Sequence, residues 1–337
     1  MVLAQFPRQS LAHLPTPLEP LERLASHLGG PRILVKRDDC TGLALGGNKT
    51  RKLEFLMAEA LAQGADTVLT TGGLQSNHVR QTAAACARLG LACHLVLVRS
   101  VDWNDPAYGI SGNVQLDHLL GAQIHMVPGG TDREKALSRL ARVLQSQGRK
   151  PYVIPGGGSN ATGSLGYVAC ALELAEQAGE QGETIDCLVH ATGSGGTQGG
   201  LVAGNAAGDM GWDILGIDIT AMPAEIGGKV RKIAKATLKK LGREDALGAA
   251  LDSDAVQIIE GHAGTAYGLP TEGMRDAVRL AARLEGLILD PVYTGKAFAG
   301  LIDLIRQGRF TSAQTVVFLH TGGMPGLFAY TEYFQAE

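Results

Sequence analysis

Three polar turns of this chain carry groups that could hold a small cofactor with an aldehyde and a phosphate. Lys49 directly follows the turn Gly46-Gly47-Asn48 and stands where a helix is predicted to begin. The runs Gln75–His78 and Gly193–Thr197 each follow an apolar, strand-like segment and open a helix-like one. A lysine amine can form a Schiff base with an aldehyde, and backbone N–H groups at a helix N-terminus bind phosphate. The combination predicts a site for pyridoxal 5'-phosphate.

The glycine-rich turn Gly193-Ser194-Gly195-Gly196-Thr197 is the predicted phosphate site. It follows the apolar run Cys187–His190, so its N–H groups would point at an anion at the start of the next helix. A dinucleotide-binding loop is the rival interpretation, but the spacing G-x-G-x-x-G fails because Gln198 replaces the third glycine. The hydroxyls of Ser194 and Thr197 suit a terminal phosphate. A glycine turn that only lets strand and helix pack closely is the structural alternative.

Two lysines are predicted to serve this cofactor. Apolar neighbours would lower the pKa of Lys49 by desolvation, which favours Schiff-base chemistry over a solvated surface charge. Lys52 lies about one helical turn further on, so it could face the same ligand and neutralise a phosphate. An ion pair at the surface is the alternative role for Lys52.

The run Gln75-Ser76-Asn77-His78 opens a predicted helix over residues 77–89. Free N–H groups at its start could hold a substrate carboxylate, and Asn77 could reach a ring hydroxyl. Ser76 could instead be a plain helix N-cap. His78 is not expected to bind a metal, because no histidine pair has HxH or HxxxH spacing.

The last polar turns are Asp290–Lys296 and His320–Gly323. Tyr293 lies in the first of them, where its phenol could contact a carboxylate or transfer a proton. It could also be a core tyrosine whose hydroxyl is bonded internally. A nucleophile elbow of the form G-x-S-x-G is absent, so a serine hydrolase is not indicated.

Apolar strand-like runs alternate with helical patterns, which predicts an α/β fold with a mostly parallel sheet and helices on both faces. The runs are Ile33–Lys36, Thr67–Thr70, His94–Val98, Ile124–Val127, Tyr152–Ile154, Cys187–His190, Ile214–Ile217 and Val316–Leu319. Helical periodicity is clearest at Arg51–Ala62, Glu134–Leu144 and Glu272–Leu284.

Glycine-rich stretches at residues 42–48 and 155–160 could mark crossings between two lobes. We therefore expect residues 52–160 to form a small α/β domain. It would be inserted into a large cofactor-binding domain made of residues 1–51 and 161–337.

The composition excludes several classes of partner. With 337 residues, 45% of them hydrophobic, the chain can bury a substantial core. A net charge of −3 provides no strong field, so neither nucleic acid nor an anionic membrane surface is expected as a partner. The five cysteines lack metal-binding or CxxC spacing and are expected to be reduced. No leader pattern and no long apolar run occurs, so we expect a cytoplasmic protein that acts on a small molecule.

The polar motifs resemble, in the same order, those of fold-type II pyridoxal phosphate enzymes. The branch they resemble most comprises D-cysteine desulfhydrase, L-cysteate sulfo-lyase and aminocyclopropane-carboxylate deaminase. The likeness begins at Phe6-Pro7-Arg8 and covers nearly the whole chain. It implies two open, twisted, mostly parallel sheets with helices on both faces, pyridoxal 5'-phosphate as cofactor, an amino acid as substrate and a homodimer.

The resemblance also implies a role for each motif residue. Lys49 would hold the cofactor covalently and act as the base at the substrate's Cα. Lys52 and residues 193–197 would bind the phosphate, and Asn77 would contact the ring hydroxyl. Ser76, with Gln75 and His78, would bind the substrate carboxylate. Tyr267 and Tyr293 would line the substrate side of the ring, and Thr321 would face the pyridine nitrogen.

These roles imply a reaction. The neutral hydroxyl of Thr321 cannot keep the pyridine nitrogen protonated, which favours prompt β-elimination over a long-lived carbanion. In the deaminases the residue after the equivalent of Tyr293 is typically glutamate, and here it is Thr294. We therefore expect a carbon–sulfur lyase that releases sulfide from D-cysteine or sulfite from L-cysteate, together with pyruvate and ammonia. Deamination of aminocyclopropane carboxylate is the alternative. A non-catalytic cofactor-binding protein and a dinucleotide oxidoreductase agree with fewer motifs.

Overall fold

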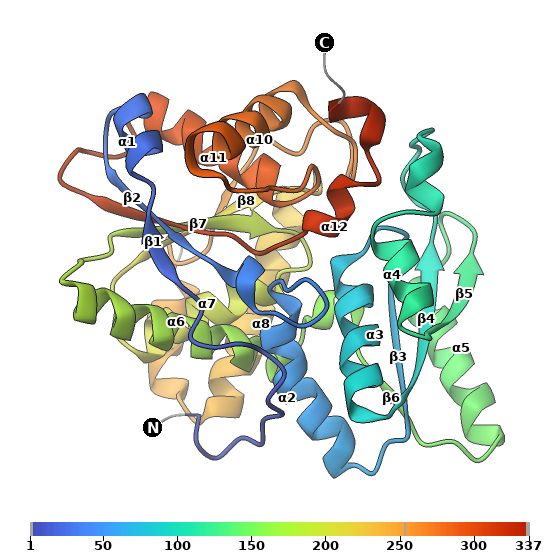
Figure 1. Cartoon of the computed structure of the whole chain (residues 1–337). Coiled ribbons are helices and arrows are strands. Elements are labelled where there is room, and N and C mark those ends of the chain that lie inside the picture. Colours follow the sequence, from blue (N-terminus) through green and yellow to red (C-terminus); the bar gives the residue numbers. More distant parts are fainter. Residues whose placement is uncertain (1–2, 253, 335–337) are drawn as a thin grey trace.

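The computed structural model describes residues 3–252 and 254–334, and the chain folds around two β-sheets (Figure 1). The larger sheet has six strands in the order β1-β2-β10-β7-β8-β9. Only β1 runs antiparallel to its neighbour. These strands are β1 (Leu18–Pro20), β2 (Arg32–Lys36), β10 (Thr315–Leu319), β7 (Cys187–Thr192), β8 (Asp213–Asp218) and β9 (Gln257–Ile259).

The smaller sheet has four parallel strands in the order β5-β4-β3-β6. They are β5 (Gln123–Val127), β4 (Ala92–Val98), β3 (Thr67–Gly73) and β6 (Pro151–Val153). The predicted α/β fold with two mostly parallel sheets is confirmed, and every predicted strand run lies on or overlaps an observed strand. The sequence patterns missed β1 and β9, because neither contains three consecutive apolar residues, whereas the equally short β6 overlaps the apolar run Tyr152–Ile154.

Helices cover both faces of each sheet (Figure 1). The helices are α1 (Glu22–Leu28), α2 (Lys49–Ala62), α3 (Asn77–Leu89), α4 (Asn113–Leu119), α5 (Arg133–Ser146), α6 (Ala161–Gln181), α7 (Gly196–Ala207), α8 (Pro223–Leu241), α9 (Leu247–Leu251), α10 (Glu272–Glu285), α11 (Thr294–Arg306) and α12 (Met324–Leu327). Short 3-10 helices occur at Asp38–Cys40, Pro106–Gly109, Gly156–Gly158, Glu244–Ala246 and Thr331–Phe334.

The packing follows from the apolar faces of these elements. Helices α6, α7, α8 and α9 bury their apolar sides against one face of the large sheet, and α1, α10 and α11 cover the other. Helices α2, α3 and α4 pack on one face of the small sheet, and α5 packs on its opposite face. Strands β2, β7 and β10 are almost entirely buried, which is why they read as continuous apolar runs.

Helix boundaries follow local chemistry. Side chains of Ser76, Asp132, Asn160 and Thr271 accept hydrogen bonds at the starts of α3, α5, α6 and α10. The predicted helices at 51–62, 77–89, 134–144 and 272–284 correspond to α2, α3, α5 and α10. All strands of the small sheet fall within residues 67–153, inside the predicted insertion, whereas the exact domain boundaries stay a prediction. Among the described residues, no helix is both long and apolar enough to cross a membrane.

Candidate active site

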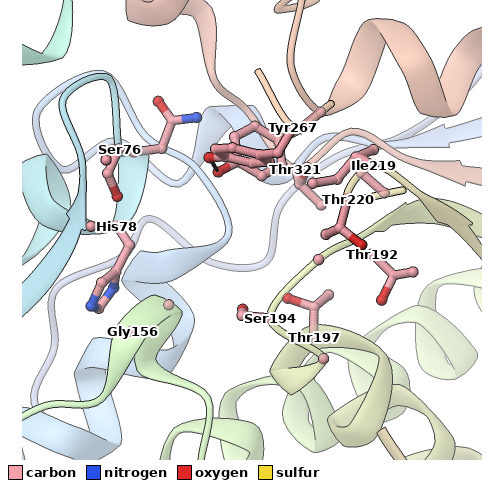
Figure 2. Close-up of a pocket in the computed structure, with 18 of the residues that line it drawn as sticks. Ser76, His78, Gly156, Thr192, Ser194, Thr197, Ile219, Thr220, Tyr267 and Thr321 are labelled. Carbon is pink, nitrogen blue, oxygen red and sulfur yellow. Dashed lines mark hydrogen bonds between the residues drawn. The ribbon is translucent and has the colours of Figure 1, made fainter. Parts of the chain in front are cut away.

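A cavity of about 670 Å³ lies where turns that follow strands of both sheets meet (Figure 2). Ser76 and His78 lie on one side of it, Ser194 and Thr197 on another, and Tyr267 and Thr321 near each other. The predicted site residues that line it are Lys49, Ser76, Asn77, His78, Gly193, Ser194, Gly195, Thr197, Tyr267, Tyr293 and Thr321. Ligands of open α/β sheets bind at this end of the strands.

Lys49 is the first residue of α2, is half-buried and lines the cavity. The turn before it requires glycine: Gly46 has φ +66°, and a Cβ there would lie 2.0 Å from the Asp39 carbonyl oxygen. Burial lowers the pKa of Lys49 to about 8, because a charged ammonium loses its hydration in the interior. A larger share of Lys49 than of an ordinary lysine is therefore neutral, and nucleophilic, near neutral pH.

Lys52 and Gly196 lie just behind the cavity wall. The Lys52 Nζ donates to the Gly157 carbonyl oxygen at 3.2 Å. Burial, and then the nearby Lys49, lower the pKa of Lys52 well below its ordinary value. A Cβ added at Gly196 would lie 2.8 Å from the Ser159 Cα and 2.9 Å from the Lys52 Nζ, so a side chain there would displace the groups that meet at the start of α7. An anion bound here would restore the positive charge of Lys52.

The glycine-rich turn after β7 forms an anion cradle at the start of α7. Gly195 adopts φ +82°, and the first turn of a helix presents N–H groups without partners inside the helix. Thr197 Oγ1 accepts from Asn48 Nδ2 at 3.1 Å and keeps its own hydrogen available for donation. Ser194 Oγ accepts from Ser159 Oγ at 2.7 Å and is free to donate as well.

Ser76 combines two of the roles considered from the sequence. Its Oγ caps α3 by accepting from the Val79 N–H at 3.3 Å, and the residue also lines the cavity. Asn77 lines the cavity too, with its Oδ1 accepting from Asn113 Nδ2 at 2.9 Å. The start of α3 thus presents backbone donors to the cavity beside an oriented amide.

Gln75 does not line the cavity. Its Nε2 donates to the carbonyl oxygens of Tyr108 (2.7 Å) and Ser111 (3.0 Å), and its Oε1 accepts from the Asn113 N–H at 3.0 Å. Direct contact of this side chain with substrate would require these bonds to break. We therefore assign the Gln75 side chain to holding the turn in place.

His78 is neutral, because burial and the nearby lysines lower its pKa well below the ordinary value. Its Nε2 lies 2.7 Å from Thr70 Oγ1. Thr70 donates its only hydroxyl hydrogen to the Ile154 carbonyl oxygen at 2.9 Å, so Nε2 must be the donor to Thr70. The buried Nδ1 consequently carries a lone pair and has no partner in the protein.

Tyr267 and Tyr293 share a hydroxyl–hydroxyl hydrogen bond, and their rings pack edge to face at 6.0 Å. Burial raises the pKa of both phenols, so they remain protonated at neutral pH and act as donors. Asp290 fixes Tyr293 by accepting its N–H at 2.8 Å. Thr294 donates to the same carboxylate at 2.7 Å and does not line the cavity.

Two buried residues of α3 connect the parts of the site and were missed from the sequence. Arg80 donates to Asn113 Oδ1 (3.1 Å) and to the Gly46 carbonyl oxygen (3.0 Å), so one guanidinium supports both the amide beside Asn77 and the lysine turn. Gln81 accepts from the Thr50 N–H at 2.9 Å and donates to the Asn77 carbonyl oxygen at 3.0 Å. Both lie inside a helix, where sequence patterns indicate only packing.

Other lining residues missed from the sequence include Ser100, Arg133, Thr220 and Met222. The residues at 129–133 and 220–222 follow strands β5 and β8 as polar or glycine-containing turns. They have the same strand–turn–helix pattern as the predicted motifs, so that pattern could have identified them. Among the described residues, no aspartate or glutamate lines the cavity.

Comparison with known proteins identifies the family. Residues 9–322 match the family described as pyridoxal-phosphate dependent enzyme. The chain belongs to this family. It is 45% identical over 343 residues to 1-aminocyclopropane-1-carboxylate deaminase of Burkholderia vietnamiensis, with 99% of each chain covered. It is also 46% identical over 329 residues to D-cysteine desulfhydrase of Serratia proteamaculans, with 97% of each chain covered.

Solved structures agree with this pyridoxal-phosphate dependent fold. A protein described as an ACC deaminase homologue superposes with a TM-score of 0.87 at 36% identity, covering 98% of this chain and 96% of that one. A threonine deaminase from T.th. superposes with a TM-score of 0.64 at 23% identity, covering 91% of this chain and 92% of that one, and supports the fold alone.

The residues of the cavity fit pyridoxal 5'-phosphate. A cavity-lining amine of lowered pKa, Lys49, suits the aldehyde, and the Gly193–Thr197 turn with Lys52 suits the phosphate. The glycine at position 196 leaves room that a side chain would fill. When bound, the cofactor supplies an electron sink for negative charge at the substrate's Cα.

Proposed function

We propose that this pyridoxal-phosphate dependent enzyme is a carbon–sulfur lyase that performs α,β-elimination on a β-sulfur-substituted alanine. D-cysteine and water would give pyruvate, sulfide and ammonia, and L-cysteate and water would give pyruvate, sulfite and ammonia. The observation that carries the proposal is the absence of any carboxylate among the described cavity-lining residues, where Thr321 offers only a neutral hydroxyl. Without a carboxylate to keep the pyridine nitrogen protonated, prompt loss of a β-leaving group is favoured over a persistent carbanion.

The chain's own groups suit the remaining steps. The backbone donors at the start of α3 and the Ser76 hydroxyl would bind the substrate carboxylate. The Lys49 amine, neutral in part because of its lowered pKa, would accept the Cα proton. Tyr293, held by Tyr267 and kept protonated, would donate a hydrogen bond on the substrate side.

Deamination of aminocyclopropane carboxylate to 2-oxobutyrate and ammonia is the second candidate, because relatives at 45% and 43% identity carry the deaminase name. The deaminase resemblance places a glutamate after the equivalent of Tyr293. Here Thr294 stands there with its hydroxyl bonded to Asp290, which favours the lyase.

The deciding experiment is incubation of cofactor-loaded enzyme with D-cysteine, L-cysteine, L-cysteate and aminocyclopropane carboxylate, followed by quantification of keto acids and of sulfide or sulfite. Pyruvate with either sulfur product would support the lyase. Formation of 2-oxobutyrate, with no pyruvate from the sulfur substrates, would replace it by the deaminase. Lys49→Ala is the matched negative control, and it should lose turnover and the visible absorbance of the bound cofactor while staying folded.

A further inference from the structure

Arg133 is a cation on the cavity wall that has no acidic partner among the described residues. It is the first residue of α5, is half-buried and lines the cavity together with Ser100. Its Nη2 donates to Ser100 Oγ at 3.4 Å. The adjacent carboxylate of Asp132 is engaged elsewhere, because it caps the Lys135 N–H at 3.1 Å and pairs with the Lys135 amine at 3.2 Å.

Arg133 lies on the tyrosine side of the cavity. Its positive charge acts on the Tyr267 phenol, lowering that pKa against the larger, raising effect of burial. Tyr267 in turn bonds Tyr293. The geometry agrees: Ser100, which Arg133 bonds, has its Oγ 3.9 Å from the position of a Cβ built on Gly73, at the start of the turn that leads to Ser76. Arg133 is therefore placed near the region that the substrate would occupy rather than near the glycine-rich turn.

The other anions expected in the cavity already have partners. The cofactor phosphate is served by the Gly193–Thr197 turn and Lys52, and the substrate's α-carboxylate by the start of α3. With no lining carboxylate among the described residues to neutralise it, the Arg133 guanidinium remains for a further negative group. A guanidinium presents a planar fork of donors that suits carboxylate and sulfonate oxygens.

We propose that Arg133 binds an anionic substituent on the substrate's Cβ and thereby selects a β-sulfonate amino acid over cysteine. This inference rests on the proposed function, since it specifies the leaving group of that elimination. In the reaction the Cβ–S bond would break, the electron pair would leave with sulfur as sulfite, and Lys49 would hold the proton taken from Cα. One water molecule is consumed when the three-carbon product becomes pyruvate and ammonia.

The test measures binding of non-reacting ligands to the cofactor-loaded enzyme by calorimetry. L- and D-aspartate carry a negative group on Cβ, whereas L- and D-alanine carry none, and none of them has a sulfur leaving group. The variants are Arg133→Gln and Arg133→Lys. The matched control is Arg139→Gln, because Arg139 is exposed on the same helix and outside the cavity.

For Arg133→Gln we expect aspartate binding to weaken about tenfold, the effect of one charge-assisted hydrogen bond reduced by partial solvent exposure. Alanine binding should stay within about twofold, and Arg133→Lys should recover part of the loss. The kcat/KM for L-cysteate should fall in parallel, while that for D-cysteine should not. Arg139→Gln should resemble the unchanged enzyme with every ligand.

Equal weakening of aspartate and alanine would assign Arg133 to the α-carboxylate and overturn the inference. So would unchanged affinities, or the absence of aspartate binding to the unmodified enzyme. The binding test is independent of the proposed function, because the difference between aspartate and alanine binding is measured without turnover. If that contrast holds and no sulfur substrate is consumed, only the reaction is wrong. If D-cysteine is consumed and the contrast is absent, only the role of Arg133 is wrong.

Discussion

Gln81→Met tests whether the hydrogen-bond network of α3 positions Lys49, the proposed catalytic lysine. Gln81 is fully buried, and its Oε1 accepts from both the backbone N–H (2.9 Å) and the hydroxyl (3.0 Å) of Thr50, the residue after Lys49. Methionine has a similar length and shape but cannot accept these bonds. The Asn77 carbonyl oxygen would lose a side-chain donor at 3.0 Å and keep its bond within the helix.

The magnitude follows from these contacts. Each lost hydrogen bond contributes about 1 kcal/mol net, and two are lost to Thr50. The Thr50 N–H retains a longer bond to the Gly47 carbonyl oxygen at 3.2 Å, so it is not left wholly without an acceptor. We therefore expect the free energy of unfolding to fall by about 2 kcal/mol. Because a displacement of about 1 Å at a reacting group can cost up to about a hundredfold in rate, kcat should fall at least about tenfold.

Equilibrium unfolding in urea, together with kcat and KM on the preferred substrate, measures both effects. Gln145→Met is the matched control, since Gln145 is exposed on α5, and it should change the free energy of unfolding by less than about 0.5 kcal/mol. A variant that loses stability with unchanged kcat would show that Gln81 only supports the fold. Equal behaviour of the two glutamine variants would refute the reasoning altogether.

Three further outcomes are expected. Gly196→Ala should weaken pyridoxal phosphate binding by at least about tenfold, because the new Cβ would lie 2.8 Å from the Ser159 Cα and 2.9 Å from the Lys52 Nζ. An unchanged affinity in equilibrium dialysis would contradict this. The pKa of Lys49 is about 8 in the folded chain and 10.5 in the unfolded chain, so between these pH values the unfolded chain binds more protons. The free energy of unfolding of the cofactor-free enzyme should therefore increase as the pH rises from 8 to about 9.5. Urea titrations should show a smaller gain for Lys49→Met, and equal gains would argue against the lowered pKa. Thr321→Asp should divert substrate to racemisation or transamination, because a carboxylate would keep the pyridine nitrogen protonated. If chiral analysis shows an unchanged product distribution, Thr321 does not contact the pyridine nitrogen.

Much of the fold could be predicted from local patterns in the chain. Buried parallel strands such as β7 and β10 are continuous apolar runs, and α3 has a capping serine at its start and a glycine after its end. These features act over a few residues, so they are visible in sequence. The short edge strands β1 and β9 escaped notice, because their pairing depends on neighbours distant in the chain.

The amino-acid sequence by itself determined that Lys49 follows a glycine turn and that polar turns follow parallel strands, which gathers them at one end of the sheets. Only the tertiary structure decided which side chains face the shared cavity. The Gln75 side chain bonds backbone carbonyl groups, the Lys52 amine lies beside Gly196 at the start of α7, and Arg133 lines the cavity from α5. The physical reason is that side-chain direction in a turn depends on packing between segments far apart in the chain, which short-range patterns do not encode.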